Sequence, residues 1–261
     1  MSTYQISAVM PSLNEEKNLP AAVNNVVASC ERLGIRGEVV IVNDGSTDST
    51  GKIAEALRSK HPFVQVVHHA SPQGIGASFW DGVKVARGEV VVMIPGDGEN
   101  DAAEILKYLP LMTQVDMVIP YVFNKEVRSG ARRLLSNIYR GIINITFGMT
   151  LNYMNGTVMY RKSILNDMTL KARGFFYQTE LLIKCIRSGY LYAEVPYALL
   201  QRAAGRSKAT SLKSLRNVIK AYLTILAEVY LSGGSRSPVS PGSVTAERWK
   251  DAGGKTSEQR P

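Results

Sequence analysis

The sequence contains few cysteines and no long hydrophobic run. Its two cysteines, Cys30 and Cys185, stand far apart and belong to no CxxC or Cys/His pattern, which excludes a disulfide scaffold and a zinc module. A membrane-spanning helix needs about 18 uninterrupted apolar residues, and the best candidates, 134–148 and 217–231, are interrupted by polar or charged side chains. With 45% hydrophobic and 20% charged residues, the composition is that of a globular protein, which we expect to be cytoplasmic.

Charge is unevenly distributed along the chain. The net charge is +9, but residues 1–100 carry eight Lys and Arg against eleven Asp and Glu, whereas residues 101–261 carry 23 against 11. A basic second part predicts a polyanionic partner: nucleic acid, an anionic membrane surface or phosphate groups. Nucleic acid is disfavoured, because the aromatic residues do not alternate with the basic ones and the sequence has no nucleic-acid-binding motif. Peripheral contact with the inner face of a membrane stays open.

Short apolar runs alternate with helical segments through the first half of the chain. The apolar runs are Ile6–Met10, Glu38–Val42, Val64–His68, Glu89–Ile94 and Asp116–Pro120. The segments of helical spacing between them are 15–33, 49–60, 74–87 and 102–110. This order predicts an α/β fold of Rossmann-like, three-layer type with a mostly parallel central sheet.

The pattern changes after about residue 125. The elements expected there are a basic amphipathic helix at 125–148, a strand at 155–161, a helix at 175–188, a strand at 191–195 and a helix at 211–231. From residue 232 the composition turns to Gly, Ser, Pro and charge, which is typical of a flexible tail. We therefore expect one domain over 1–231, with halves at 1–124 and 125–231, followed by a tail at 232–261.

Acidic residues follow the predicted strands. Ligands on parallel α/β sheets bind beyond the carboxyl ends of the strands, and three of the four segments there contain Asp or Glu. The four segments are Pro11–Glu16, Asn43–Asp48, His69–Gly76 and Pro95–Asp101. Asp44 precedes a glycine turn, and an acceptor at that place can pair with a base N–H or a ribose hydroxyl, so we expect it to contact a ligand.

Other polar residues in these segments are explained equally well as helix caps. Asp48 lies in the first turn of a predicted helix, and Asp101 stands three residues before Glu104, the spacing of a capping box. Ser12 and Glu15 have the same spacing and predict that a helix starts there.

Asp97 and Glu99 lie in a glycine-rich turn that needs no cap. If the turn is extended, the two side chains share one face. Hard oxygen ligands beside a phosphate are those that Mg²⁺ or Mn²⁺ prefers, so we predict metal or diphosphate coordination.

The glycines at 74–76 do not form a dinucleotide fingerprint, because Phe79 occupies the third glycine position.

Basic residues form two clusters, Arg128, Arg132, Arg133 and Arg140 in the segment 125–148, and Arg202, Arg206 and Lys208 in the loop 201–208. Arginine forks and lysine point charges both match phosphate groups, so we favour phosphate binding over the alternative, a solvated charged face. The amphipathic segments 130–147 and 211–231 are expected either to lie in a membrane interface or to pack on the core.

Together these motifs resemble glycosyltransferase family 2, whose members have the GT-A fold. The motifs of the first half are PSLNEE (11–16), VNDGSTDST (42–50), the glycine run at 74–77 and the acidic turn at 97–99. The later motifs resemble the polyprenyl-phosphate branch, the dolichyl-phosphate mannose synthase-like enzymes; they are NGTVMYR, FFYQTELLIK, AEVP and RAAGRSK. The resemblance covers about residues 5–215.

The resemblance implies a donor site in the first half. The residues implied to line the nucleotide pocket are Pro11, Leu13, Glu15 and Asp44. Asp97 matches the second Asp of the family's DxD motif, and Glu99 matches a nearby metal ligand, so Mg²⁺ or Mn²⁺ is the implied cofactor.

The second half then supplies the acceptor site. Arg132 and Ser136 match a pair that holds the lipid phosphate, and Glu180 matches an acidic residue behind the acceptor. Arg202 and Lys208 match basic residues that close over the donor diphosphate. The sequence departs from the family pattern at Pro95, which replaces the first Asp of DxD, at Asn152, which replaces an Asp, and near Tyr121, where an Arg is absent.

The implied function is inverting transfer of a sugar from a UDP- or GDP-linked donor to a lipid phosphate. A phosphate acceptor is already anionic near neutral pH and needs no strong general base. A sugar-hydroxyl acceptor would need one, with Glu180 as the candidate. The residues also leave open a nucleotidyltransferase and a non-catalytic relative that binds a sugar-nucleotide.

Overall fold

The structure is a computed structural model that describes residues 4–124, 130–166, 168–198, 212–231 and 238–253. Its strands are β1 (Ile6–Ser12), β2 (Gly37–Asn43), β3 (Val64–His68), β4 (Val90–Met93), β5 (Met117–Val122), β6 (Met159–Arg161) and β7 (Tyr192–Tyr197). Its helices are α1 (Leu19–Leu33), α2 (Thr50–Lys60), α3 (Ile75–Val85), α4 (Ala103–Leu106), the 3₁₀ turn η1 (Leu109–Thr113), α5 (Gly130–Phe147), α6 (Lys162–Leu165), α7 (Tyr177–Arg187), α8 (Leu212–Tyr230) and α9 (Val244–Asp251).

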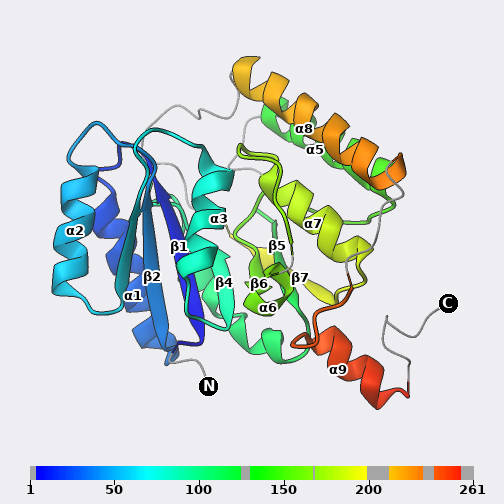
Figure 1. Ribbon diagram of the computed structural model, residues 1–261, viewed down its shortest axis with the longest axis horizontal. Helices are drawn as coiled ribbons and strands as arrows, with labels where there is room; N and C mark the ends of the chain where they lie inside the picture. The colour runs from blue at the N-terminus through cyan, green and yellow to red at the C-terminus, as the bar shows by residue number, and fades with distance from the viewer. Residues whose placement is uncertain (1–3, 125–129, 167, 199–211, 232–237, 254–261) are drawn as a thin grey trace.

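The strands form one seven-stranded sheet in the order β3-β2-β1-β4-β6-β5-β7 (Figure 1). Strands β3, β2, β1 and β4 are parallel, and so are β5 and β7. The short β6 is antiparallel to both of its neighbours, β4 and β5. Since β4 and β5 both run opposite to β6, they run in the same direction as each other. The carboxyl ends of all the parallel strands therefore meet at one edge of the sheet. The predicted α/β fold with a mostly parallel sheet is confirmed.

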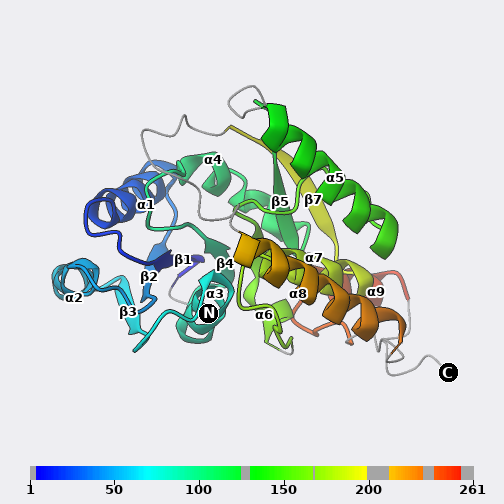
Figure 2. The same ribbon diagram turned by 90° about the horizontal axis from the view of Figure 1, so that it is seen from above.

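Both faces of the sheet are covered, as the β-branched runs predicted. Side chains alternate along each strand: Val9 and Val40 pack in one core with α3 and α7, while Ala8 and Val39 pack in the other core with α1, α2 and α4. The view along the sheet in Figure 2 shows α1 and α4 on one side of the strands and α3 on the other.

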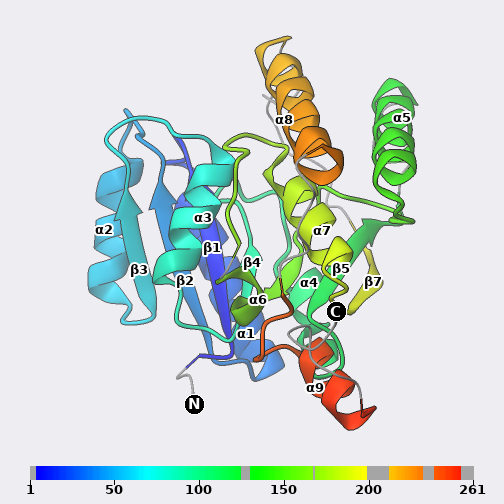
Figure 3. The same cartoon turned by 45° about the vertical axis from the view of Figure 1, so that its right-hand side comes forward.

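Helices α5 and α8 lie at the same end of the molecule as the carboxyl edge of the sheet, beyond α7 (Figures 1 and 3). The rings of Phe147 and Tyr222 meet edge to face with their centroids 6.0 Å apart, and the hydroxyls of Thr146 and Tyr222 share a hydrogen bond of 3.0 Å. Each helix also keeps a row of large apolar side chains exposed. Among the described residues, no helix is both long and apolar enough to cross a membrane.

The predicted helix start at Ser12 is wrong. Ser12 is the last residue of β1 and pairs with Asn43 of β2, and helix α1 begins at Leu19. Between them Asn14 adopts a left-handed conformation with φ 59°, which interrupts any helix. Pairing with the neighbouring strand therefore overrides the local capping-box spacing.

The segment expected to be a flexible tail also differs from its prediction, because residues 244–251 form α9. Asp116, fully buried at the start of β5, accepts hydrogen bonds from the backbone amides of Val244 (2.8 Å) and Thr245 (3.1 Å) and from the Thr245 hydroxyl. Arg161 lies 3.3 Å from the same carboxylate. Because Asp116 lies far from α9 in the sequence, the composition of the tail alone could not predict this helix.

Helix α3 lies unusually close to the sheet at Gly82. A Cβ at this position would overlap the side chain of Val9 and come within 3.2 Å of Val42. We predict that Gly82→Ala lowers the free energy of unfolding by about 1–3 kcal/mol, because the packed core cannot accommodate the methyl group. Urea unfolding measures this change. Gly141→Ala on α5 is the matched control, because no atom lies within 4 Å of its added Cβ; equal losses in both variants would contradict the packing argument.

Candidate active site

Two loops at the carboxyl edge of the sheet, which follow β1 and β2, are joined by hydrogen bonds. The amide of Glu15 donates to the Thr50 hydroxyl (2.8 Å), the amide of Thr47 donates to Asn14 Oδ1 (2.9 Å), and the amide of Glu16 donates to Asp48 Oδ2 (3.2 Å). These bonds bring the predicted nucleotide-pocket segment Pro11–Glu16 beside the loop that carries Asp44.

Asp48 and Asp101 each accept a hydrogen bond at the start of a helix, although the N-cap residues are Ser49 of α2 and Ala102 of α4. Asp48 Oδ1 accepts a 2.9 Å hydrogen bond from the amide of Thr50, the first residue of α2. Asp101 Oδ1 accepts a 3.0 Å bond from the amide of Ala103, the first residue of α4. Both carboxylates compensate the free amides of a helix N-terminus.

Asp44 is buried, and both of its carboxylate oxygens accept hydrogen bonds from the protein. Oδ1 accepts from the amide of Gln73 and from His69 Nδ1, each at 2.7 Å, and Oδ2 accepts from the amide of Gly74 at 2.9 Å. Burial opposes ionisation, but the bonds from Gln73, His69 and Gly74 outweigh it and hold the pKa of Asp44 below its ordinary value. The structure therefore gives Asp44 a clear first task, which is to fix the loop 69–74.

His69 is a residue of this site that the sequence pattern does not single out. Its ring is nine-tenths buried between two carboxylates, with Nδ1 bonded to Asp44 and Nε2 3.2 Å from Asp81 Oδ2. Its position directly after β3, in the one strand-end segment without an acidic residue, is the only signal that the sequence offers.

Asp97 and Glu99 lie in the turn that follows β4. The amide of Glu99 donates a 3.1 Å hydrogen bond to Asp97 Oδ1, and Gly98 between them has φ 71°. The amide of Gly96 donates to the carbonyl of Pro11 at 3.1 Å, and a side chain at Gly96 would overlap Ser12. The turn is thus held against the end of β1, next to the predicted nucleotide pocket.

This turn fits a divalent ion that shares its ligands with a diphosphate. Its two carboxylates, on Asp97 and Glu99, are hard oxygen donors of the kind that Mg²⁺ and Mn²⁺ prefer. Pro95 contributes no donor, and the described part of the chain contains no cluster of three His, Cys, Asp or Glu side chains that could hold a metal. Phosphate oxygens and water would therefore have to complete the coordination sphere.

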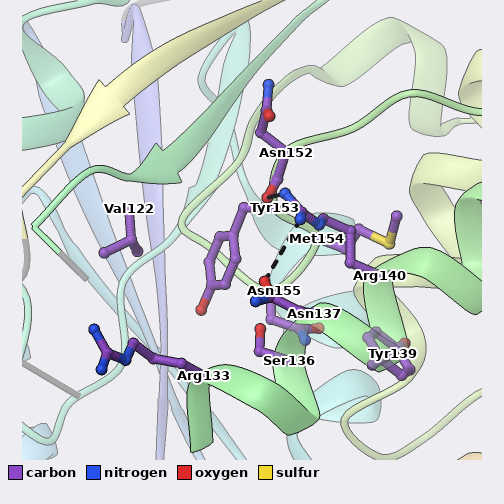
Figure 4. Close-up of a pocket in the computed structure, with 10 residues that line it drawn as sticks. All are labelled: Val122, Arg133, Ser136, Asn137, Tyr139, Arg140, Asn152, Tyr153, Met154 and Asn155. Carbon is purple, nitrogen blue, oxygen red and sulfur yellow. Dashed lines mark hydrogen bonds between the residues drawn. The ribbon is translucent and has the colours of Figure 1, made fainter. Parts of the chain in front are cut away.

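A pocket of about 300 Å³ lies between α5 and residues 152–155 (Figure 4). Arg133, Ser136, Tyr139 and Arg140 line it from α5, and Val122 at the end of β5 closes it on the sheet side. The structure thus places the predicted phosphate ligand Ser136 in a basic pocket at the carboxyl edge. Its arginine neighbours, Arg133 and Arg140, belong to the basic cluster for which the sequence favours phosphate binding.

Hydrogen bonds hold the lining of this pocket in place. Arg140 donates from Nη1 to the carbonyl of Asn152 at 3.3 Å and from Nη2 to Asn137 Oδ1 at 3.5 Å. The hydroxyl of Tyr139 shares a 2.7 Å bond with the hydroxyl of Thr179 on α7. Burial raises the pKa of Tyr139 to about 12, so its hydroxyl is protonated at neutral pH.

Glu180 does not present a free carboxylate to the pocket or to the carboxyl edge of the sheet. Its side chain is completely buried. Oε1 accepts from the amide of Lys171 (2.9 Å) and from Lys184 Nζ (2.7 Å), and Oε2 accepts from the amide of Ala172 (2.7 Å). This environment fits a structural anchor better than a general base.

Two predicted ligands lie outside the described residues, and the side chain of a third is not described. Arg202 and Lys208, predicted at the donor diphosphate, fall within residues 199–211, and the side chain of Arg132 is not among those described.

The fold and the site together define a class of protein. A parallel α/β sheet carries paired loops and an acidic turn at its carboxyl edge, the arrangement in which such sheets bind nucleotides. The sequence profile described as "Glycosyl transferase family 2" matches residues 7–169, more than half of the chain. The chain therefore belongs to glycosyl transferase family 2, and it is a glycosyltransferase.

Curated relatives are named for lipid-linked sugar transfer. The chain is 29% identical over 219 residues to a polyprenol monophosphomannose synthase of Mycolicibacterium smegmatis, across 79% of this chain and 81% of the relative. It is 31% identical over 166 residues to an undecaprenyl-phosphate 4-deoxy-4-formamido-L-arabinose transferase of Pseudomonas savastanoi pv. phaseolicola, across 62% of this chain. The chain spans about half of that second relative, 49% of its length.

Solved structures agree on the fold. Glucosyl-3-phosphoglycerate synthase from Mycobacterium tuberculosis, solved with Mn²⁺, UDP-glucose and phosphoglyceric acid, superposes with a TM-score of 0.62 over 86% of this chain and 80% of that one. The identity is 20%, so the likeness concerns the fold. The predicted GT-A fold is confirmed.

We predict that Asp44→Asn destabilises the protein by about 1.5–3 kcal/mol at pH 7, because an amide can no longer accept on both sides of the group. Folding lowers the pKa of Asp44, so its stabilising contribution is complete above the unfolded-state pKa of about 3.9 and disappears as the pH falls through the lower folded-state value. Urea unfolding from pH 7 down to pH 3 should show the difference from wild type shrinking. Asp251→Asn on the exposed face of α9 is the control, and a loss independent of pH would refute the assignment.

Proposed function

We propose that this chain transfers a sugar, with inversion, from a nucleotide-sugar to a polyprenyl-phosphate type of lipid. The observation that carries the proposal is the basic pocket of Arg133, Ser136 and Arg140, which opens at the carboxyl edge of the sheet on a helix with an exposed apolar face. The relatives named for polyprenol and undecaprenyl phosphate support the same acceptor class.

The donor occupies the carboxyl edge of β1, β2 and β4. Pro11, Leu13 and Glu15 line the nucleotide pocket on one side, and the loop fixed by Asp44 forms the other. Asp97 and Glu99 face the diphosphate, where a bound Mg²⁺ or Mn²⁺ would neutralise charge on the leaving group. UDP and GDP are both compatible with these residues.

The acceptor phosphate binds in the basic pocket. Guanidinium groups of Arg133 and Arg140 offer forked donors that match phosphate oxygens, and the hydroxyl of Ser136 adds a neutral donor. A phosphate oxygen attacks without a general base. The state of Glu180 supports this choice over a sugar hydroxyl, because both of its oxygens already accept hydrogen bonds.

Helices α5 and α8 rest on the membrane surface that supplies the lipid. Their exposed apolar residues recur at helical spacing along one face of each helix; they are Leu134, Leu135, Ile138, Ile142 and Ile145 on α5, and Leu215, Ile219, Leu223, Tyr230 and Leu231 at α8. Exposed Arg133, Arg216 and Lys220 on the same helices complement anionic headgroups. In this arrangement the protein is peripheral to the cytoplasmic face of the membrane.

The function is tested by incubating the purified chain with radiolabelled UDP- and GDP-hexoses, short-chain polyprenyl phosphate, and Mn²⁺ or EDTA. We expect label in the lipid fraction with one donor. In Arg140→Gln the KM for the lipid phosphate should rise about tenfold or more, as expected when one charge-assisted hydrogen bond of about 1.5–3 kcal/mol is lost. The exposed Lys107→Gln should leave it unchanged. Transfer to a free sugar hydroxyl, with none to the lipid phosphate, would overturn the proposal.

Membrane contact is tested by flotation with vesicles containing anionic lipid. We expect the wild-type chain to float, and Ile145→Asp to float much less, because a side chain that is 86% exposed on α5 would place a charge in the interface. Leu33→Asp, near the end of α1 and 37% exposed, is the matched control. Equal flotation of both variants, or dimerisation of the wild type in place of flotation, would contradict a membrane role for these helices.

A further inference from the structure

We propose that Glu180 is a positioning residue for the donor site, acting through the loop 171–173 and the N-terminus of α3. The proposal rests on the proposed function for the identity of the donor, but its residues belong to the second half of the chain. It therefore assigns to α7 the task of connecting the donor edge with the acceptor pocket.

The first link is the buried carboxylate of Glu180. It receives the amides of Lys171 and Ala172 and the ammonium group of Lys184, three donors shared between two oxygens. Lys184 Nζ also donates to the carbonyl of Thr169 at 2.7 Å. A fully buried charge is tolerated when its lone pairs are matched in this way, so the loop is fixed to α7.

The second link is the carbonyl of Arg173. It accepts hydrogen bonds from the amides of Gly76 (2.8 Å) and Ala77 (3.3 Å), which are otherwise free donors in the first turn of α3. The approach needs glycine, because a Cβ on Gly76 would lie 2.6 Å from the carbonyl oxygen of Ala172, and one on Gly74 would lie 2.7 Å from that of Arg173.

The third link returns to the donor edge. Arg173 Nη1 donates to Gln73 Oε1 at 3.2 Å, and the amides of Gln73 and Gly74 donate to Asp44. Asp44 and the start of α3 are thus held from both sides, by β2 and by the loop that Glu180 fixes. Movement of that loop would move the wall of the nucleotide pocket.

The same turn of α7 contacts the acceptor side. Thr179, the residue before Glu180, shares its hydroxyl hydrogen bond with Tyr139 in the acceptor pocket. On α8, Glu228 lies 2.9 Å from Lys171 Nζ and 3.5 Å from Lys184 Nζ. The segment 179–184 of α7 therefore contacts the donor loop, the pocket and a helix proposed to lie on the membrane.

The test compares the full-length wild type with Glu180→Gln and the milder Lys184→Gln. Nucleoside diphosphate affinity is measured by titration calorimetry with UDP and GDP in the presence of Mn²⁺, KM values are measured for both substrates, and melting temperature reports folding. We expect Glu180→Gln to weaken nucleotide binding about tenfold, in the range of typical coupling between sites, with a smaller effect in Lys184→Gln. The KM for the lipid phosphate should change less than the KM for the donor. Glu31→Gln and Lys107→Gln on the surface are the matched controls.

The outcomes separate the two proposals. If wild type binds a nucleotide and both variants bind it equally well, the positioning role is wrong while the proposed function stands. If Glu180→Gln abolishes turnover with both affinities intact, Glu180 acts in the chemical step and the positioning role is again wrong. If wild type binds nucleotide but transfers no sugar to the lipid phosphate, the proposed function fails, and the loss of nucleotide affinity in the variants still decides the role of Glu180.

Discussion

Buried carboxylates that collect backbone amides from distant segments hold this structure together. Asp44 binds the loop 69–74 to β2, Glu180 binds the loop 171–173 to α7, and Asp116 binds α9 to β5. Glu38, completely buried in β2, accepts in the same way from the Ser7 hydroxyl and from Arg87. A buried charge without partners costs several kcal/mol, about 1–3 for each unmade hydrogen bond and more when the group is charged. Each of these contacts therefore fixes its segment in one position, and two of the loops, 69–74 and 171–173, belong to the proposed donor site.

The placement of β6 explains how the proposed donor and acceptor sites come to lie at one edge of the sheet. Because β6 is antiparallel between β4 and β5, the chain leaves the donor half, forms α5, and returns through residues 152–158 to the centre of the sheet. This path sets α5 against the segment 152–155 at the edge where β4 ends. The turn of Asp97, proposed to face the donor, and the pocket of Ser136 then share one edge, although they lie 39 positions apart in the sequence.

Local patterns were sufficient to predict most of the elements and the edge of the sheet at which the site lies. Apolar alternation located the strands, and the spacing of Asp48 and Asp101 placed them beside helix starts, where each accepts an amide although neither is the N-cap residue. The errors concern residues whose environment is made by distant partners. Ser12 joins a strand because Asn43 lies beside it, and α9 forms because Asp116 offers it a carboxylate. Local patterns do not single out His69, because its contacts with Asp44 and Asp81 form only when the chain folds. The role of Glu180 stays a prediction, and its hydrogen bonds with the amides of residues 171 and 172 could not be read from local spacing.

The uneven charge of the chain acquires a physical meaning from this geometry. The donor edge is acidic, with Asp97 and Glu99 in its turn, and a diphosphate placed there is repelled unless cations accompany it. Pro95 removes one carboxylate from that turn, which lowers the repulsion and also removes a metal ligand. More positive charge must then come from the protein, and residues 101–261, with 23 Lys and Arg against 11 Asp and Glu, supply it. In the proposed reaction, the arginines of the pocket bind a phosphate that is already anionic, so attraction brings the nucleophile to the donor and no buried base has to be kept free. Because such an acceptor needs no general base, Glu180 can instead position the donor site, which is the role that its hydrogen bonds favour.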